Sequence, residues 1–237
     1  MKIADTFGPG TASHQPLIRA TMEVYSPRFV LELGIGLYST PLFCEYKTSL
    51  TGIDNSMEWV SYMKERYSHE ILFHSLGDIN INTRLSSLTL AQRHDIYNYY
   101  NTMILPKIKP SLLFVDQWAS CRTLSINALS DKFDLIMYHD SEPAGVDFME
   151  YDLISVKGFH RYTLRTSTAW TTLLVREDKG FELLNEKILP HIENYRTLNN
   201  ETYMELTHEN DSQDISPDME HRFTNGNDAG ICRNVIP

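Results

Sequence analysis

Apolar and polar positions along the chain predict short buried strands that alternate with amphipathic helices. Short apolar runs rich in Leu, Ile, Val and Phe end in polar residues or glycine, which is typical of buried strands. Between these runs apolar residues recur at helical spacing, as in 56–67, where Trp59, Val60, Met63 and Tyr67 share one face. Five strands are predicted in the first part of the chain, over residues 28–33, 49–54, 71–76, 111–116 and 134–139.

Helices are predicted between these strands and at both ends of the pattern. Ser39, Thr40 and Pro41 form a strong helix start, in which a hydroxyl N-cap candidate precedes a proline in the first turn. Because proline also ends helices, the first helix should stop at Pro27 and a long helical connection should stop before Pro106. The predicted helices cover residues 14–25, 56–67, 85–105, 121–132 and 181–189.

The later part of the chain changes character. Residues 160–166 and 168–175 are predicted to be strands with almost nothing between them, so they should pair antiparallel. The earlier alternation of strands and helices predicts a parallel sheet with helices on both faces. The fold class we expect is therefore α/β, with an antiparallel hairpin as the last part of the sheet.

The net charge of −10 is concentrated near the end of the chain. Residues 197–221 hold seven of the 31 acidic residues and no Lys or Arg, so the rest of the chain is near neutral. We expect residues 197–237 to form an irregular, acidic, solvated tail. No basic stripe typical of a nucleic-acid-binding protein is apparent, so nucleic acid is a minority interpretation.

Cysteine usage and hydropathy give a simple expectation about the compartment. Cys44, Cys121 and Cys232 are widely spaced and form no CxxC pair, which favours a reducing, cytoplasmic setting. No apolar run approaches the length of a membrane-spanning helix, so we expect no membrane partner. The sequence leaves open whether the chain forms a homo-oligomer.

The segment VLELGIGLYST, residues 30–40, contains the first chemical signal. It reads as a strand, a Gly-x-Gly turn at Gly34 and Gly36, and a helix start. Glycine is needed where a cofactor passes close to the backbone, and a helix N-terminus attracts anionic groups. Asp54 ends the next strand 20 residues after Gly34, where a carboxylate can hold the two hydroxyls of a ribose. These features together predict a nucleotide-like cofactor.

The details of the turn distinguish between two cofactor classes. A dinucleotide fingerprint requires a third glycine where this chain has Ser39, whereas Glu32 precedes the first glycine by two residues. In this respect the sequence resembles the class I S-adenosylmethionine (SAM) dependent methyltransferases, over roughly residues 14–178. Tyr38 stands where that family's variable third glycine would be. The resemblance implies a Rossmann-like, mostly parallel, seven-stranded sheet.

The resemblance also implies roles and a division of the chain. The turn would cradle the methionine part of SAM with Glu32 orienting it, Asp54 would hold the ribose, and Asp78 would contact the adenine amino group. The cofactor-binding candidates are Glu32, Gly34, Gly36, Tyr38, Ser39, Asp54, Asn55, Asp78 and Asp116. The parts we expect are an N-terminal arm and helix (1–27), a methyltransferase domain (28–178), and a C-terminal helix with the acidic tail (179–237), packed on or beside that domain.

A second constellation follows the fourth and fifth predicted strands. Asp116 ends one of these strands, and His139 and Asp140 end the other, so their side chains should converge in one crevice. Asp116 and Asp140 could hold Mg²⁺ and so activate a hydroxyl, as in the metal-dependent O-methyltransferases that the segment resembles in part. Alternatively, His139 beside Asp140 could act as a general base without a metal.

Two further residues are candidates for contact with the acceptor. Glu142 lies on the loop expected to face the acceptor. His14 is included as a substrate contact, although a structural role is the simpler interpretation.

The function we expect is methyl transfer from SAM to a hydroxyl, or an amine, of a small polar acceptor such as a sugar. Two alternatives remain open. One is a SAM-binding module without catalysis, and the other is a nucleic-acid or protein methyltransferase that acts with a partner. No Pro-Pro dipeptide is present, which argues against the D/N-P-P-Y motif of base-amino methyltransferases.

Overall fold

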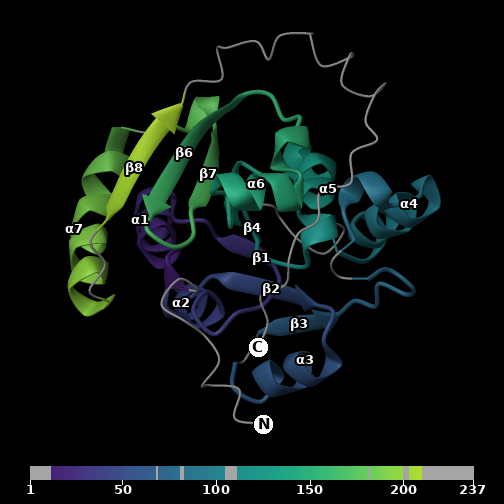
Figure 1. Ribbon diagram of the computed structural model, residues 1–237. Coiled ribbons are helices and arrows are strands. Elements are labelled where there is room, and N and C mark those ends of the chain that lie inside the picture. The colour runs from purple at the N-terminus through teal and green to yellow at the C-terminus, as the bar shows by residue number, and fades with distance from the viewer. Residues whose placement is uncertain are drawn as a thin grey trace, which may run out of the picture.

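The computed structural model describes residues 12–67, 69–80, 83–104, 111–180, 182–199 and 203–209. Within them, eight strands form one sheet in the order β3-β2-β1-β4-β5-β7-β6-β8 (Figure 1). The expected mixed α/β fold is therefore confirmed. The strands are β1 (Phe29–Leu33), β2 (Ser49–Asp54), β3 (Glu70–Phe73), β4 (Leu112–Val115), β5 (Leu135–His139), β6 (Phe159–Thr166), β7 (Thr171–Arg176) and β8 (Met204–Glu209).

The first five strands are parallel and follow the order 3-2-1-4-5 of Rossmann-like sheets. Every residue of β1, β4 and β5 is buried, because helices cover both faces. The chain leaves β1 toward one edge of the sheet and leaves β4 toward the other. The point where these directions diverge, between β1 and β4, is where such sheets bind ligands.

The antiparallel part of the sheet is larger than predicted. The expected hairpin is present as β6 and β7, but β8 pairs with the outer edge of β6 and makes eight strands instead of seven. The prediction of an irregular tail from residue 197 was therefore wrong for β8. Met204 is buried and Leu206 packs against the same core cluster, which is the period-two pattern of an edge strand. The surrounding acidic residues obscured that pattern, and residues 210–237 lie outside the described part of the chain.

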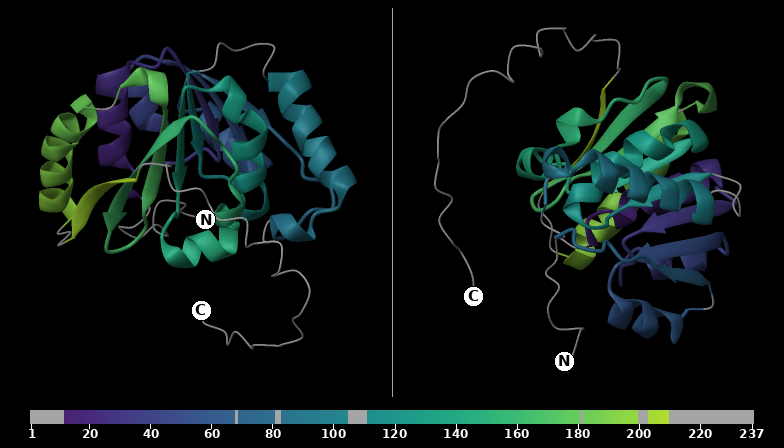
Figure 2. Two further views of the ribbon diagram at one scale, coloured as in Figure 1. Left: turned by 90° about the horizontal axis from the view of Figure 1, so that it is seen from above. Right: turned by 90° about the vertical axis from the view of Figure 1, so that its right-hand side faces the viewer.

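Helices lie on both faces of the sheet (Figure 2). The cluster on one face includes α1, α2 and α7, and the cluster on the other includes α4 and α5, while α3 packs against β2 and β3. The α-helices are α1 (Gln15–Tyr25), α2 (Thr40–Glu45), α3 (Met57–Lys64), α4 (Leu90–Tyr99), α5 (Ala119–Leu129), α6 (Pro143–Met149) and α7 (Glu182–Asn199).

Two predicted helices have different limits in the structure. α7 continues through Pro190 to Asn199 rather than ending at residue 189. A proline inside a helix costs about 3 kcal/mol, and burial of Leu184, Ile188 and Ile192 offsets that cost. The long connection predicted over 85–105 is broken: a 3₁₀ turn precedes α4, and a π-helical turn, Tyr100–Ile104, follows it.

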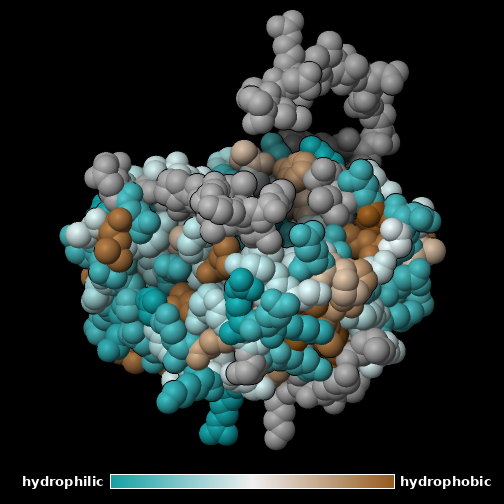
Figure 3. Space-filling model, turned by 90° about the horizontal axis from the view of Figure 1, so that it is seen from below, coloured by the Kyte–Doolittle hydropathy of each residue, from teal (hydrophilic) through white to brown (hydrophobic). Residues whose placement is uncertain are grey.

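The surface seen from below is mainly polar, and apolar side chains appear on it as small separate patches (Figure 3). No helix in the described ranges is both long and apolar enough to cross a membrane. The division into parts at residues 27 and 178 stays a prediction, although α1 and α7 pack against each other.

Candidate active site

A cavity of about 470 Å³ opens at the carboxyl ends of β1, β2, β4 and β5. Its place is the switch point between β1 and β4, and its size is that of a small-molecule site. The described residues that line it are His14, Gly34, Ile35, Gly36, Leu37, Tyr38, Ser39, Asp54, Asn55, Trp59, Asp116, Gln117, Trp118, His139 and Asp140. Ten of the residues predicted from the sequence are therefore brought together: His14, Gly34, Gly36, Tyr38, Ser39, Asp54, Asn55, Asp116, His139 and Asp140.

The two glycines of the turn are needed for different reasons. Gly34 has φ +86°, and a Cβ atom there would collide with the backbone of Asp116 and Gln117. Its role is thus to let the ends of β1 and β4 approach, with the Asp116 amide donating to the Leu33 carbonyl at 2.7 Å. A Cβ at Gly36 would meet the Ser39 hydroxyl at 2.8 Å. Gly36 is therefore the less constrained of the two positions.

Glu32 stabilises the glycine turn through hydrogen bonds. Its carboxylate is fully buried and accepts hydrogen bonds from the Ser39 hydroxyl at 2.6 Å and the Thr40 hydroxyl at 2.7 Å. The Thr40 oxygen in turn accepts from the Gly36 amide at 3.2 Å. Burial raises the pKa of Glu32 to about 8, despite these hydrogen bonds.

The predicted helix start at residues 39–41 is confirmed, but the Ser39 side chain does not cap the helix. Ser39 occupies the N-cap position of α2, but its side chain makes no capping hydrogen bond and donates to Glu32 instead. The Ser39 backbone is helical, with φ −97° and ψ −54°, and not in the extended conformation from which an N-cap oxygen reaches the free amides of the first turn. The hydroxyl therefore fixes the turn and not the helix start.

Asp54 ends β2 with its carboxylate in the cavity wall. Its Oδ1 accepts from the Ser56 amide at 2.8 Å, and burial raises its pKa. The Trp59 indole donates to the Ile35 carbonyl at 2.6 Å and so fixes a flat aromatic surface beside the glycine turn. An acidic group, a glycine turn and an aromatic wall here match the needs of a ribose-containing ligand with an amino-acid portion.

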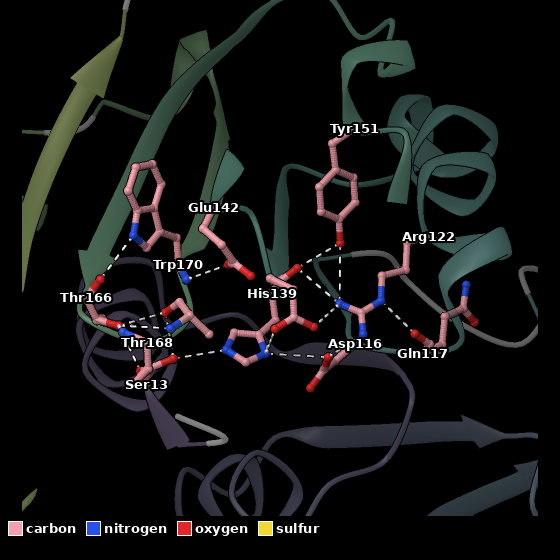
Figure 4. A network of polar contacts seen from close by, with 12 residues as sticks. Ser13, Asp116, Gln117, Arg122, His139, Glu142, Tyr151, Thr166, Thr168 and Trp170 are labelled. Atoms are coloured by element: carbon pink, nitrogen blue, oxygen red, sulfur yellow. Dashed lines mark hydrogen bonds and ion pairs between the residues drawn. The ribbon is translucent and has the colours of Figure 1, made fainter. Parts of the chain in front are cut away.

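Arg122 is the principal residue that sequence analysis missed. Its guanidinium lies 2.9 Å from Asp116 Oδ1 and 2.9 Å from Asp140 Oδ2, with the side chain only 8% exposed (Figure 4). It also donates to the carbonyl oxygens of Gln117 and His139. Burial opposes its charge, but its partners Tyr151, Asp116 and Asp140 raise the pKa of Arg122 above its ordinary value.

This guanidinium decides how well Mg²⁺ fits the two carboxylates. Mg²⁺ requires near-octahedral oxygen ligands at about 2.0–2.1 Å. Between Asp116 and Asp140 the cation is already Arg122, which pairs with one oxygen of each. The Asp116–Asp140 pair therefore does not fit the Mg²⁺ site expected from the sequence, and we derive no step through that ion.

His139 lies between Ser13 and Asp116 (Figure 4), and its ring also faces Asp140. Its Nε2 lies 3.0 Å from Ser13 Oγ, and Ser13 donates its own proton to the Ala169 carbonyl at 2.9 Å. Since that proton is used, Ser13 can only accept, and Nε2 must carry hydrogen. Nδ1 then faces Asp140 Oδ1 at 3.4 Å and Asp116 Oδ1 at 3.6 Å. Burial lowers the pKa of His139, but these two carboxylates outweigh it and raise the pKa above its ordinary value.

The pKa of Asp116 is shifted in the opposite direction to that of His139. Burial alone would raise its pKa, but the charges of Arg122 and His139 outweigh burial and lower the pKa to about 2. Asp140 is held in a left-handed backbone conformation, with φ +57°. A strained residue of this kind persists where its surroundings fix it, and such residues cluster at active sites.

Besides Glu32, which lies beneath the turn, two predicted residues lie outside this cavity. Asp78 is exposed and lines a separate hollow with His74 and Asp95. Glu142 accepts from the Trp170 amide at 3.0 Å, where it anchors the start of α6. The structure thus gives both residues surroundings unlike those expected, and their proposed contacts with adenine and acceptor stay predictions.

A scan against protein-family models found no match, and neither did a search of curated proteins. Among solved structures, the chain is similar to a methyltransferase-like protein from Silicibacter pomeroyi, with 15% identity, coverage of 72% of this chain and 87% of that chain, and a TM-score of 0.45. It is also similar to the N-methyltransferase NodS from Bradyrhizobium japonicum, with 10% identity, coverage of 73% and 98%, and a TM-score of 0.42.

A third structure is magnesium protoporphyrin IX methyltransferase from Synechocystis PCC 6803 with bound SAM. It has 11% identity to this chain, coverage of 70% and 79%, and a TM-score of 0.41.

Proposed function

We propose that this protein is a SAM-dependent methyltransferase that acts on a hydroxyl or amine of a small polar acceptor. The observation that carries the proposal is the cavity at the β1–β4 switch point. It combines a glycine turn stabilised by Glu32, a carboxylate at the end of β2 and a row of titratable groups at the ends of β4 and β5. A cofactor and an acceptor can meet at such a point.

The chain's residues divide into two groups around the cavity. Gly36 and the neighbouring backbone would lie along the amino-acid portion of SAM, and Asp54 would accept hydrogen bonds from its ribose hydroxyls. Trp59 would pack along the ligand as a fixed apolar wall. SAM, when bound, would supply an electrophilic methyl group.

The acceptor side is formed by Asp140, Asp116 and His139. Holding an acceptor oxygen or nitrogen in line with the methyl group would be the main source of rate enhancement. Asp140 Oδ1 would take the acceptor's proton, because Oδ2 is already paired with Arg122. Ser13 and Asp116 hold His139 beside that carboxylate, with His139 Nδ1 3.4 Å from Asp140 Oδ1.

Calorimetric titration with SAM and with S-adenosylhomocysteine tests the cofactor. Wild-type protein should bind both, and Asp54→Ala should bind them at least tenfold more weakly. Asp131→Ala is the matched control, because Asp131 is a surface carboxylate paired with Lys132 outside the cavity, and its loss should leave affinity unchanged. Folded protein that binds neither ligand would contradict the proposal.

A second experiment separates catalysis from binding alone. Asp140→Asn should retain SAM affinity and lose turnover with any acceptor found in a screen of sugars and other small alcohols and amines. If wild-type protein binds SAM but transfers no methyl group in that screen, a non-catalytic module becomes the better interpretation. Turnover that requires an added protein or RNA would instead support the alternative of a partner-dependent enzyme.

A further inference from the structure

His14 presents a buried imidazole whose polar atoms are unused. The residue is 2% exposed, and neither ring nitrogen has a hydrogen-bond partner among the described residues. Its ring packs edge-on against His139, with centroids 5.0 Å apart, and against Phe114 at 5.4 Å. Leaving buried polar atoms unsatisfied costs about 1–3 kcal/mol each, so an apolar ring would be the better choice if packing were the whole role.

His14 is not alone at this point of the cavity. A ring nitrogen of His14, a carboxylate oxygen of Asp116 and a ring nitrogen of His139 lie within 4.8 Å of one another. Ligands of one transition ion bind at about 2.0–2.2 Å and so lie roughly 3–4 Å apart. Small rotations of these side chains would bring the three donors to a common ion.

The neighbours of these donors orient them as outer partners of metal ligands do. Ser13 holds the Nε2–H of His139, which leaves Nδ1 directed at the carboxylates, where a cation is favoured. Arg122 pairs with Asp116 Oδ1, and ligating carboxylates commonly accept such an outer hydrogen bond.

We propose that His14, Asp116 and His139 form a site for a divalent first-row transition ion such as Zn²⁺ or Fe²⁺. Two imidazoles and one carboxylate suit these ions and not Mg²⁺, which prefers oxygen alone. The ion would take the place of the hydrogen on His139 Nδ1.

The site would keep open coordination positions. All three residues line the same cavity, so those positions face the space where a small molecule would lie. Three protein ligands with a free position are typical of ions that bind a reacting oxygen. An acceptor hydroxyl is the candidate for that position; this last step rests on the proposed function, whereas the metal site itself does not.

The test uses Co²⁺ as a spectroscopic probe on chelator-treated full-length protein, without SAM. Wild-type protein should bind one equivalent, with the visible absorption of an ion in a low-symmetry site that contains nitrogen ligands, and Zn²⁺ but not Mg²⁺ should displace it. His14→Phe keeps an aromatic ring against Phe114 and should weaken Co²⁺ binding at least tenfold. His94→Ala, on the exposed surface of α4, is the matched control and should bind like the wild type.

Two results would overturn the site: folded wild-type protein that binds no Co²⁺ or Zn²⁺, or unchanged affinity in His14→Phe. Should His14→Phe not fold, X-ray absorption of the wild-type Co²⁺ complex still decides, because the site requires two imidazoles on the ion. Asp54→Ala separates this proposal from the cofactor proposal. That variant should lose SAM affinity and keep Co²⁺ affinity.

Discussion

Replacing Arg122 by methionine tests the electrostatic core of the site most directly. Methionine keeps an unbranched side chain in α5 but removes the cation that compensates Asp116 and Asp140. Removing one partner of a buried ion pair costs about 3–5 kcal/mol, because the other charge stays buried. The side chains of Asp116 and Asp140 are 26% and 30% exposed, so water can solvate part of the charge that Arg122 no longer compensates. We therefore expect a loss of about 3 kcal/mol in the free energy of unfolding.

Urea denaturation followed by far-UV circular dichroism measures this loss, with an unchanged m value as the sign that the unfolded state is unaffected. Arg19→Met is the matched control, because Arg19 pairs with Glu45 at the surface, and such pairs contribute about 0–1 kcal/mol. Adding Asp116→Asn to Arg122→Met should recover part of the loss, since one uncompensated charge is removed. A loss no larger than that of Arg19→Met would refute the reasoning.

Three further predictions concern the glycine turn, Asp54 and His14. Gly34→Ala should destabilise the protein by roughly 2–4 kcal/mol in thermal denaturation, from a positive φ and a collision with the β4 backbone. Gly36→Ala should cost about 1 kcal/mol, since only the Ser39 hydroxyl must move; equal losses would show that the β1–β4 approach is not the constraint. Asp54→Ala should weaken SAM binding by about 1.5–3 kcal/mol in calorimetry while the melting temperature stays near that of the wild type. Burial lowers the pKa of His14 from 6.5 to about 3, so its neutral form stabilises the fold above pH 6.5 and that contribution is lost as the pH falls toward 3. Urea denaturation across this range should show a steeper acid loss for wild type than for His14→Phe, and parallel curves would contradict it.

Local sequence patterns predicted most of the strands and helices of the fold. The apolar runs located β1, β2, β4 and β5 because strands buried on both faces need nearly continuous apolar residues. Alternation of strands and helices then predicted parallel pairing, and with it a crevice at the carboxyl ends. β8 was not predicted, because its alternation of buried and exposed residues is short and lies among acidic residues. Its partner strand, β6, is also distant in sequence.

The sequence by itself determined which chemical groups reach the cavity. Gly34, Asp116 and Asp140 each follow a strand directly and Asp54 is the last residue of one, so local position was enough to place them there. The glycine itself was predicted for contact with a cofactor, whereas the structure shows that Gly34 first permits the approach of β4.

Only the tertiary structure decided how those groups are paired. Arg122 lies on α5 and Ser13 precedes α1, and nothing in their local sequence indicates that each lies against the groups at the ends of β4 and β5. A parallel sheet joins distant segments through crossovers, so such contacts depend on packing between elements and not on spacing along the chain. For that reason the sequence predicted two carboxylates in one crevice, but the fold determined that their shared cation is an arginine.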